Sequence, residues 1–382
     1  MAVFMQVSSF ADLQNPWQHE EVITDAERYF DGMLDAIRQA RARVDLDFYM
    51  MELDSIGERF IEALSAAVTR GVRVRMVIDG VGSYEGAAEI AQRLSTAGVD
   101  IRVYHPLPFT WKAFRWSFAQ GNFLQKLVYF SLQVNKRNHH KLCVVDGRHL
   151  WTGSINLSAS HLPKDKGGEG WRDCAVHIQD AAASETAQRM YQHWFKADQN
   201  KTRLGVRRLW TDFTQQQRVF KRRYIIRCLR HAKQRIWITS AYFAPPQSIV
   251  RALLYAASQG VDVRVILPAR SDVPVFPLLS RSYYKQLVDG GVKVYEYQAS
   301  ILHAKLVMID DACLIGSTNL NHRSWFHDLE VDTLLTQKKS IEALELMMKE
   351  DREASVEILS RVNFPWYQRW AMRCVKQFRY WF

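Results

Sequence analysis

Cysteine is scarce in this sequence and widely spaced. The chain of 382 residues contains five cysteines, and no two of them have the spacing of a zinc site or a redox pair. Nothing in the spacing supports a disulfide scaffold, so we expect reduced thiols in a cytosol-facing protein. The cysteines are Cys143, Cys174, Cys228, Cys313 and Cys374.

A membrane-spanning hydrophobic run is also missing. The first residues lack the basic and apolar regions of a signal peptide. The longest apolar window, residues 116–134, is interrupted by Asn122, Lys126 and three glutamines. We therefore expect no transmembrane helix, and a protein that lies on a membrane surface if it meets a membrane at all.

Acidic residues are outnumbered by basic ones. The chain has 51 Lys and Arg against 40 Asp and Glu, which gives a net charge of +11 and a pI near 9.4. This balance predicts an anionic partner, which could be nucleic acid, an acidic membrane surface or a phosphate-bearing substrate. Hydrophobic residues make up 48% of the chain, enough for two domains or one duplicated unit.

The hydrophobic pattern of the chain occurs twice. Helical periodicity alternates with short β-branched runs in both halves. In the first half, helices are expected at 24–43, 56–70 and 85–97, and strands at 44–50, 71–80 and 99–104. In the second half, helices are expected at 215–233, 247–258 and 280–288, and strands at 235–243, 260–268 and 291–297. The pattern predicts two tandem α/β domains, residues 1–200 and 201–382, each a mixed, mostly parallel sheet flanked by helices.

Each half also contains one copy of a motif. Residues 138–156 and 302–319 both read H-x-K, four residues, Asp, a short gap and then G-S-x-N. Strand side chains alternate, so the His and Lys of a copy share one face, as do its Ser and Asn. One set from each copy can therefore meet in a single pseudo-symmetric site. The two sets are His139, Lys141, Ser154 and Asn156, and His303, Lys305, Ser317 and Asn319.

These side chains suit chemistry at a phosphodiester. A neutral imidazole can attack the anionic phosphate, while a second imidazole protonates the leaving alkoxide and later deprotonates the incoming hydroxyl. Lysines and amides would hold the phosphate oxygens in the transition state. Such a site needs neither a metal nor another cofactor. Two buried structural histidines are the alternative, but the identically spaced lysines make it a poor explanation.

The paired motifs resemble the H-K-D signature of the phospholipase D superfamily. The stretches DFYMMELDSIG, AYFAPP, GGVKVYEY and GSTNLNHRSW are similar to bacterial cardiolipin synthases, and the resemblance covers roughly residues 24–335. It implies an active site between the two domains, in which His139 attacks phosphorus to give a phosphatidyl-histidine and His303 is the general acid and then the base. It also implies phosphate binding by Lys141 and Lys305, and by the Ser and Asn of each motif.

The motif aspartates, Asp146 and Asp310, are included among the catalytic residues by this resemblance. Their parity along the strand differs from that of the lysines, so we expect them to support the site or to fix turns. Asp173 in RDCAVHI and Glu330 in LEVDTLL lie at matching positions downstream of the motifs. They are candidates to orient the two histidines.

The second motif is one residue shorter than the first. Six residues separate Asp146 from Gly153, whereas five separate Asp310 from Gly316. A deletion within a strand would invert the side chains that follow it. We expect the turn after Asp310 to be shortened instead, which leaves the downstream serine and asparagine in place.

The first half carries an additional segment. Gly98 and His139 are 41 residues apart, but Gly291 and His303 only 12, so about 29 residues are inserted at about 106–136. The insertion contains eight aromatic residues and no acidic one. It could pack on the core as an extra helix, or dip into the lipid interface through Trp111 and Trp116.

The C-terminal tail, residues 365–382, has a similar composition. On a helical wheel, Trp366 and Trp370 fall on an aromatic half, and Arg369 and Arg373 on a basic one. A helix docked on the protein and an interfacial membrane anchor both fit this pattern.

The resemblance to bacterial cardiolipin synthases implies a phosphatidyltransferase that makes cardiolipin from phosphatidylglycerol, with another phospholipid such as phosphatidylethanolamine as a further candidate donor. We expect anionic phospholipids, namely phosphatidylglycerol and cardiolipin, as partners, and a peripheral position on the cytoplasmic face of a bacterial inner membrane. A phospholipase D-type phosphodiesterase or nuclease is an alternative, although the aromatic segments argue against nucleic acid as the partner. A non-catalytic membrane-binding protein is a third possibility. The sequence decides neither the acceptor alcohol nor the oligomeric state.

Overall fold

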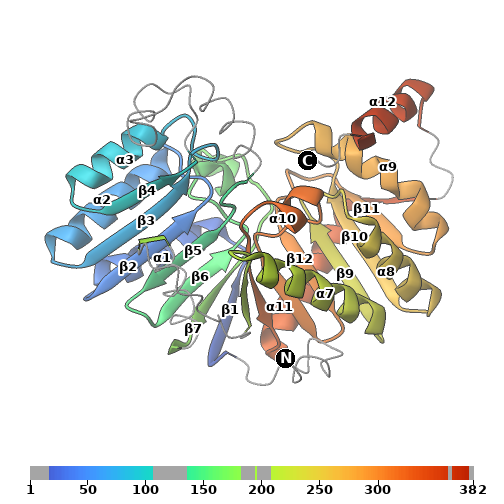
Figure 1. Cartoon of the computed structure of the whole chain (residues 1–382), viewed down its shortest axis with the longest axis horizontal. Helices are drawn as coiled ribbons and strands as arrows, with labels where there is room; N and C mark the ends of the chain where they lie inside the picture. The colour runs from blue at the N-terminus through green and yellow to red at the C-terminus, as the bar shows by residue number, and fades with distance from the viewer. Residues whose placement is uncertain (1–16, 106–135, 182–193, 196–207, 360–363, 378–382) are drawn as a thin grey trace.

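A computed structural model describes residues 17–105, 136–181, 194–195, 208–359 and 364–377 (Figure 1). Two mixed β-sheets lie next to each other, and helices cover their outer faces (Figure 1). Apart from Lys136, the aromatic insertion at about 106–136, with Trp111 and Trp116, lies outside the described residues.

The first half forms a seven-stranded sheet in the order β1-β7-β6-β5-β2-β3-β4. Helix α1 (Ala26–Gln39) precedes three parallel strands, β2 (Arg43–Phe48), β3 (Arg73–Asp79) and β4 (Asp100–Tyr104), which α2 (Ser55–Thr69) and α3 (Ala87–Thr96) connect. The remaining strands are antiparallel to their neighbours: β5 (Lys141–Val145), β6 (His149–Gly153), β7 (Ala175–Gln179) and β1 (His19–Ile23). Short 3-10 helices η3 (Ala159–His161) and η4 (Lys164–Lys166) lie between β6 and β7.

The second half repeats this connectivity in an eight-stranded sheet, β15-β11-β10-β9-β12-β13-β14-β8. Its parallel unit contains α7 (Gln215–His231), β9 (Arg235–Ser240), α8 (Gln247–Ser258), β10 (Asp262–Pro268), α9 (Val275–Asp289) and β11 (Lys293–Tyr297). Its antiparallel strands are β12 (Lys305–Ile309), β13 (Ala312–Gly316), β14 (Val331–Leu335), β8 (Leu209–Thr211) and β15 (Ser355–Ile358). The other helices are α10 (His322–Phe326), α11 (Lys338–Glu353) and α12 (Trp366–Gln377).

The duplicated α/β architecture predicted from the sequence is confirmed, but the description of the sheets as mostly parallel is wrong. Each sheet has two parallel strand pairs, against four antiparallel pairs in the first and five in the second. The motif strands return through short turns, and only antiparallel neighbours allow this. All described strands of the first sheet come from residues 19–179, and those of the second from 209–358. The division at residue 200 falls outside the described ranges and stays a prediction.

Local sequence signals explain where the helices begin. The Asp54 side chain accepts hydrogen bonds from the backbone N–H groups of Ile56 and Gly57 and caps α2. In the second half, Thr214 and Gln217 form a reciprocal capping box at the start of α7. The apolar faces of these helices pack on the outer faces of the sheets.

The inner faces of the two sheets share one hydrophobic core. Leu142, Val144 and Val176 of the first half pack in the same buried cluster as Leu306 and Met308 of the second half. Helix α11 closes this cluster with a buried apolar stripe: Ile341, Leu344, Met347 and Met348. A contiguous apolar interface of this kind holds the two halves in one arrangement. The groups that lie between the sheets are therefore positioned by both halves.

Helix α12 is docked on α9 at the edge of the second half (Figure 1). Met372 is buried there, and Lys376 Nζ lies 4.4 Å from the centre of the Tyr283 ring. Its tryptophans point away from the protein, because Trp366 is 74% exposed and Trp370 67% exposed. The described helices include none with the length and apolar character needed to cross a bilayer.

Candidate active site

The two motif histidines lie where the motif strands of both halves begin. The His139 backbone N–H donates to the Leu329 carbonyl oxygen at 2.9 Å, and the His303 N–H donates to the Arg172 carbonyl oxygen at 2.8 Å. Residues Leu329 and Arg172 directly precede the two predicted orienting acids. Each histidine is therefore held beside the acid that belongs to the other half.

The carboxylate of each acid also contacts the histidine of the opposite half. Asp173 Oδ2 lies 2.6 Å from His303 Nδ1, and Glu330 Oε1 lies 3.3 Å from His139 Nδ1. Both acids thus occupy the places that the sequence predicts, and the structure adds which histidine each one contacts. Each motif histidine is therefore paired with an acid from the opposite half.

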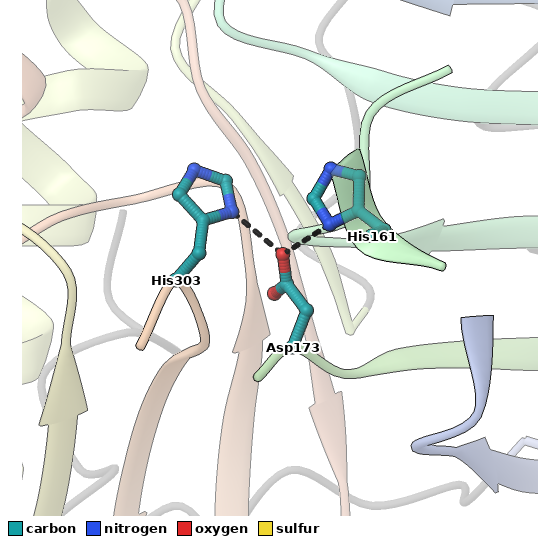
Figure 2. Close-up of side chains that lie close together, drawn as sticks. All are labelled: His161, Asp173 and His303. Carbon is teal, nitrogen blue, oxygen red and sulfur yellow. Dashed lines mark hydrogen bonds and ion pairs between the residues drawn. The ribbon is translucent and has the colours of Figure 1, made fainter. Parts of the chain in front are cut away.

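Asp173 is an ionised carboxylate with several donors. It accepts hydrogen bonds from His303 Nδ1, from the Ser154 hydroxyl and from the Cys174 N–H. His161 Nδ1 lies 3.2 Å from the same Oδ2 atom that His303 contacts (Figure 2). Burial opposes ionisation, but the two imidazoles outweigh it and hold the pKa of Asp173 well below its usual range.

The pKa of Glu330 is shifted in the opposite direction from that of Asp173. Burial raises its pKa to about 7, although hydrogen bonds from Ser317 and Ser324 oppose the shift. Its Oε1 atom is within ion-pair distance of His139 but makes no hydrogen bond to any residue that the structure describes. His139 Nδ1 also lies 3.3 Å from the Ser317 carbonyl oxygen. A carbonyl can only accept, so Nδ1 carries the proton and Nε2 has the free lone pair.

The two motif lysines are buried between the halves. Lys141 Nζ donates to the His139 carbonyl oxygen at 3.0 Å, and Lys305 Nζ donates to the His303 carbonyl oxygen at 2.6 Å. Burial and the charge of Lys305 lower the pKa of Lys141 to about 7, and burial also lowers that of Lys305. Because the charge of Lys305 disfavours the charged form of Lys141 in the interior, a bound anion would stabilise both ammonium groups.

The same surroundings keep both imidazoles neutral in the free site. Burial, followed by the charge of Lys141, holds the pKa of His139 well below its ordinary value. Burial and Lys305 lower the pKa of His303 to about 4, against the opposing effect of Asp173. Lys305 Nζ also lies 3.0 Å from His303 Nε2, which must therefore be the unprotonated nitrogen.

The motif asparagines have polar atoms available for a ligand. Asn319 Oδ1 accepts from the Tyr242 backbone N–H at 3.1 Å. Its Nδ2 atom and Oδ1 of Asn156 are buried, with no hydrogen-bond partner among the described residues. An unsatisfied buried amide costs about 1–3 kcal/mol, so these atoms mark positions that a bound polar group would stabilise.

The shortened second motif leaves the strand register intact, as predicted. In the first motif Val145 pairs with His149, so the turn holds three residues. In the second, Ile309 pairs with Ala312, so the turn holds two. The missing residue is removed from the turn alone, and Asn319 lies on the same side as its counterpart.

Asp146 and Asp310, which the resemblance includes among the catalytic residues, do not lie beside the histidines. Both follow the far ends of their strands, away from the histidines, and both have φ of 50°. The Asp146 carboxylate accepts from three backbone N–H groups, those of Arg41, Ala42 and Arg43. The Asp310 carboxylate accepts likewise from Lys233, Gln234 and Arg235. The turn-fixing role expected from strand parity is the one that these contacts support.

Ser154 and Ser317, which are predicted to bind phosphate, make hydrogen bonds to the two acids. Both side chains are fully buried. The Ser154 hydroxyl donates to Asp173, and the Ser317 hydroxyl donates to Glu330. Because the hydroxyl protons are used in this way, the serines hold the two acids in place.

Sequence reasoning missed two tyrosines beside the histidines. The Tyr49 ring packs edge-on against His139 at 4.6 Å between ring centres, and Lys141 Nζ lies 5.3 Å from the centre of the same ring. Tyr242 has the equivalent relationship to His303 and Lys305, at 6.4 and 6.0 Å. Tyr49 follows β2 and Tyr242 follows β9, the first strands of the two parallel units, so their matching positions in the repeat could have indicated them.

Sequence reasoning also missed His161, which is 2% exposed. Among the described residues, it forms a group with Asp173 and His303. One ring nitrogen or carboxylate oxygen from each lies within 4.8 Å of the others, which is close enough to hold a metal ion. The 2.6 Å contact between Asp173 and His303 is a hydrogen-bond distance. Ligand atoms about 2.0–2.2 Å from a tetrahedral metal would lie farther apart, so the spacing favours a hydrogen bond between Asp173 and His303 over ligation of a metal.

Comparison with known proteins agrees with this geometry. The family described as "Cardiolipin synthase, PLD-like domain" matches residues 33–198 and 225–352. A cardiolipin synthase of Halalkalibacterium halodurans is 30% identical over 368 residues, which cover 91% of this chain and 69% of that protein. Cardiolipin synthase 2 of Bacillus anthracis is 29% identical over 352 residues, which cover 88% of this chain and 65% of that protein. The chain thus spans about two thirds of the length of these relatives.

Among solved structures, phosphatidylserine synthase of Haemophilus influenzae superposes with a TM-score of 0.68. The superposition covers 96% of this chain and 95% of that one, at 14% identity. At this identity the likeness shows the fold alone. The resemblance indicated by the paired motifs is confirmed by the family match, and the chain belongs to the cardiolipin synthase family of phospholipase D-like proteins.

Proposed function

We propose that this protein is a phosphatidyltransferase that uses His139 as the nucleophile and His303 as the general acid and base. The observation that supports these roles is the difference between the Nδ1 partners of the two histidines. His303 faces the ionised Asp173, which can stabilise an imidazolium. His139 faces a carbonyl oxygen and the weakly acidic Glu330, which suit a neutral imidazole.

The first step forms a covalent intermediate. The phosphate enters between the two ammonium groups, and its negative charge raises the pKa of His303 so that Nε2 gains a proton. His139 Nε2 attacks phosphorus as the bond to the leaving glycerol oxygen breaks. That oxygen takes the proton from His303 Nε2, and phosphatidyl-histidine and a free alcohol result.

The second step reverses these roles. An acceptor hydroxyl gives its proton to His303 Nε2 and attacks the phosphorus, and the N–P bond to His139 breaks. Lys141, Lys305 and the Asn319 amide stabilise the charge on the phosphate oxygens in both steps. No step in this scheme requires a metal ion.

Phosphatidylglycerol is the proposed donor and acceptor, and cardiolipin and glycerol are the products. This choice rests on the relatives named cardiolipin synthase, at about 30% identity over most of the chain. The net charge of +11 favours such anionic lipids. We further propose a peripheral position on the cytoplasmic face of a bacterial inner membrane, with the exposed Trp366 and Trp370 of α12 in contact with lipid.

Two substrates distinguish the roles of the histidines. With phosphatidylglycerol, mass spectrometry of the lipid products should find cardiolipin for the wild type and none for His139→Ala or His303→Ala. With a phosphatidyl ester of p-nitrophenol, the leaving group needs no proton. His303→Ala should then still release nitrophenol in a burst and retain an acid-labile phosphatidyl adduct, while His139→Ala should do neither.

The same assay tests the proposal against its alternatives. Phosphatidic acid as the sole wild-type product would identify water as the acceptor and a phosphodiesterase. An adduct that persists in His139→Ala would reject His139 as the nucleophile. Wild-type protein that changes neither substrate would reject the enzymatic role.

A further inference from the structure

His161 lies beside the two-histidine site, and the reaction described above does not use it. It ends the short helix η3 and is buried in the first half. Its Nε2 accepts the backbone N–H of Asn156 at 3.1 Å. Its Nδ1 lies 3.2 Å from Asp173 Oδ2, on the opposite side of that oxygen from His303 (Figure 2).

These contacts determine the tautomer of His161. An N–H group can only donate, so Nε2 must carry the lone pair and Nδ1 the proton. The Nδ1–H group then lies within ion-pair distance of Asp173 Oδ2, without the geometry of a hydrogen bond to any described residue, and His303 Nδ1 approaches the same oxygen at 2.6 Å. Two imidazole N–H groups therefore approach one carboxylate oxygen, and that of His303 forms the hydrogen bond (Figure 2).

The second half has a serine where the first has His161. Ser324 lies five residues after Asn319, as His161 lies five residues after Asn156. Its hydroxyl oxygen accepts the Asn319 backbone N–H at 3.3 Å, and the hydroxyl hydrogen-bonds Glu330. The link from the asparagine backbone to the acid therefore exists in both halves, but an imidazole forms it only on the side of His303.

We propose that His161 is a positioning residue for His303. It shares the Asp173 carboxylate oxygen with His303, keeps the imidazole of His303 in the tautomer with Nε2 toward the substrate, and limits how strongly Asp173 holds the His303 proton. This inference rests on the proposed function of the same site. Its consequence is that His303 can release and accept a proton in successive steps, because the Asp173 charge is divided between two donors.

Titratable groups from both halves surround His303 and enter any test of this role. Lys305 comes from its own strand, and Asp173 and His161 come from the first half. His139 and Lys141 lie across the site. Tyr242, which donates to Asp272, packs against the His303 ring from the second half. Substitution of His161 leaves all of the other groups in place.

The variant His161→Ser copies the arrangement of the other half. With one donor removed from Oδ2, Asp173 acts on His303 alone, so the pKa of His303 should rise by ~0.5 or more. The variant His161→Gln keeps one acceptor and one donor without an imidazole, and it should leave the pKa near the wild-type value. The pKa is measured in the free protein by NMR titration of histidine labelled with nitrogen-15, with His303→Gln used to assign the signal.

Turnover gives the second readout. His161→Ser should lower kcat about tenfold with little change in KM, and the alkaline limb of its kcat profile should move to higher pH. His161→Gln should recover most of kcat. The exposed His231 supplies a control, because His231→Ser should match the wild type in every measurement.

The outcomes separate this proposal from the proposed function. If folded His161→Ser has the wild-type His303 pKa, or a lower one, His161 is not a positioning residue. If its pH profile has the wild-type shape at reduced kcat, its role is structural and the proposal fails. If His161→Ser raises the His303 pKa but the wild-type protein makes no cardiolipin, the positioning role of His161 is supported and the proposed lipid product is rejected.

Discussion

Asp173 of the first half contacts His303 of the second half, with 2.6 Å between the carboxylate Oδ2 and the imidazole Nδ1. Glu330 of the second half approaches His139 of the first at 3.3 Å. The crossing follows from the backbone, because the segment before each motif strand pairs with the residue before the opposite acid. A pseudo-symmetric fold thus contains two His–acid pairs whose charge states differ.

The two acids should respond unequally to loss of charge. Asp173→Asn removes an ionised partner from His303 and changes the acceptor that the Nδ1–H group faces, so kcat should fall by about 10³ or more, as when the acid of a catalytic triad is neutralised. Glu330→Gln should cost about tenfold, because Glu330 has a pKa of about 7 and His139 retains the Ser317 carbonyl oxygen as a partner. Cardiolipin formation from labelled phosphatidylglycerol measures both, with thermal unfolding as the control for folding. Equal losses would contradict the different roles of the two histidines.

The pH dependence should differ between kcat/KM and kcat. His139 stays neutral through the neutral range because its pKa is well below the ordinary value. Burial and Lys305 lower the pKa of His303 to about 4 in the free protein, so its acid form is lost as the pH rises through that region. Bound phosphate places a negative charge beside His303 and raises its pKa, so the acid form persists to higher pH in the complex.

The alkaline limb of kcat should therefore lie at higher pH than that of kcat/KM, since the first reports the complex and the second the free enzyme. Mixed micelles of fixed lipid composition, assayed from acidic to alkaline pH, provide the measurement. Coincident limbs would show that substrate does not change the protonation of His303.

Much of this architecture can be predicted from the sequence, because local hydrophobic periodicity and motif spacing mark both copies of the repeat. The parallel units and the positions of His139, Lys141, His303 and Lys305 depend on periodicity and spacing alone. Which acid meets which histidine depends instead on pairing between halves that are far apart in the chain. Likewise, the parity of Asp146 indicates a turn, but only its three backbone contacts rule out a place beside the histidines.

His161 shows a second limit of sequence reasoning. It lies outside the motif and is not a histidine in the other half, so neither spacing nor repetition marks it. Its importance arises from η3, which brings it to the opposite side of Asp173 from His303. The strands that sequence reasoning did not place, such as β1 and β15, are short edge strands whose pairing is also non-local.

Helix α12 should contribute to membrane binding through its exposed tryptophans. Burying one large apolar side chain contributes about 1.5–3 kcal/mol, so Trp366→Ala combined with Trp370→Ala should weaken binding to phosphatidylglycerol vesicles by at least tenfold. Both side chains point away from the protein, and the buried Met372 should keep the helix docked. Vesicle flotation gives the affinity, and Tyr255→Ala, an exposed aromatic on α8, is the matched control. Binding equal to that of the control would assign membrane contact to another surface.

The motif aspartates should affect stability and leave turnover unchanged. Asp146 has φ of 50° and accepts three backbone N–H groups, and Asp310 repeats this arrangement in the second half. Asp146→Ala removes the acceptors and places alanine in a left-handed conformation, so unfolding should become about 2–3 kcal/mol easier.

Asparagine tolerates the left-handed conformation and keeps one acceptor, so Asp146→Asn should lose less stability than the alanine variant. Both variants should keep kcat within about twofold when activity is expressed per folded molecule, since the carboxylate lies at the end of β5 far from His139. Chemical denaturation followed by circular dichroism measures the first quantity, and cardiolipin formation below the unfolding transition measures the second. A large loss of kcat in fully folded Asp146→Asn would support a catalytic role for Asp146. Its contacts in the turn would then not explain why the motif contains it.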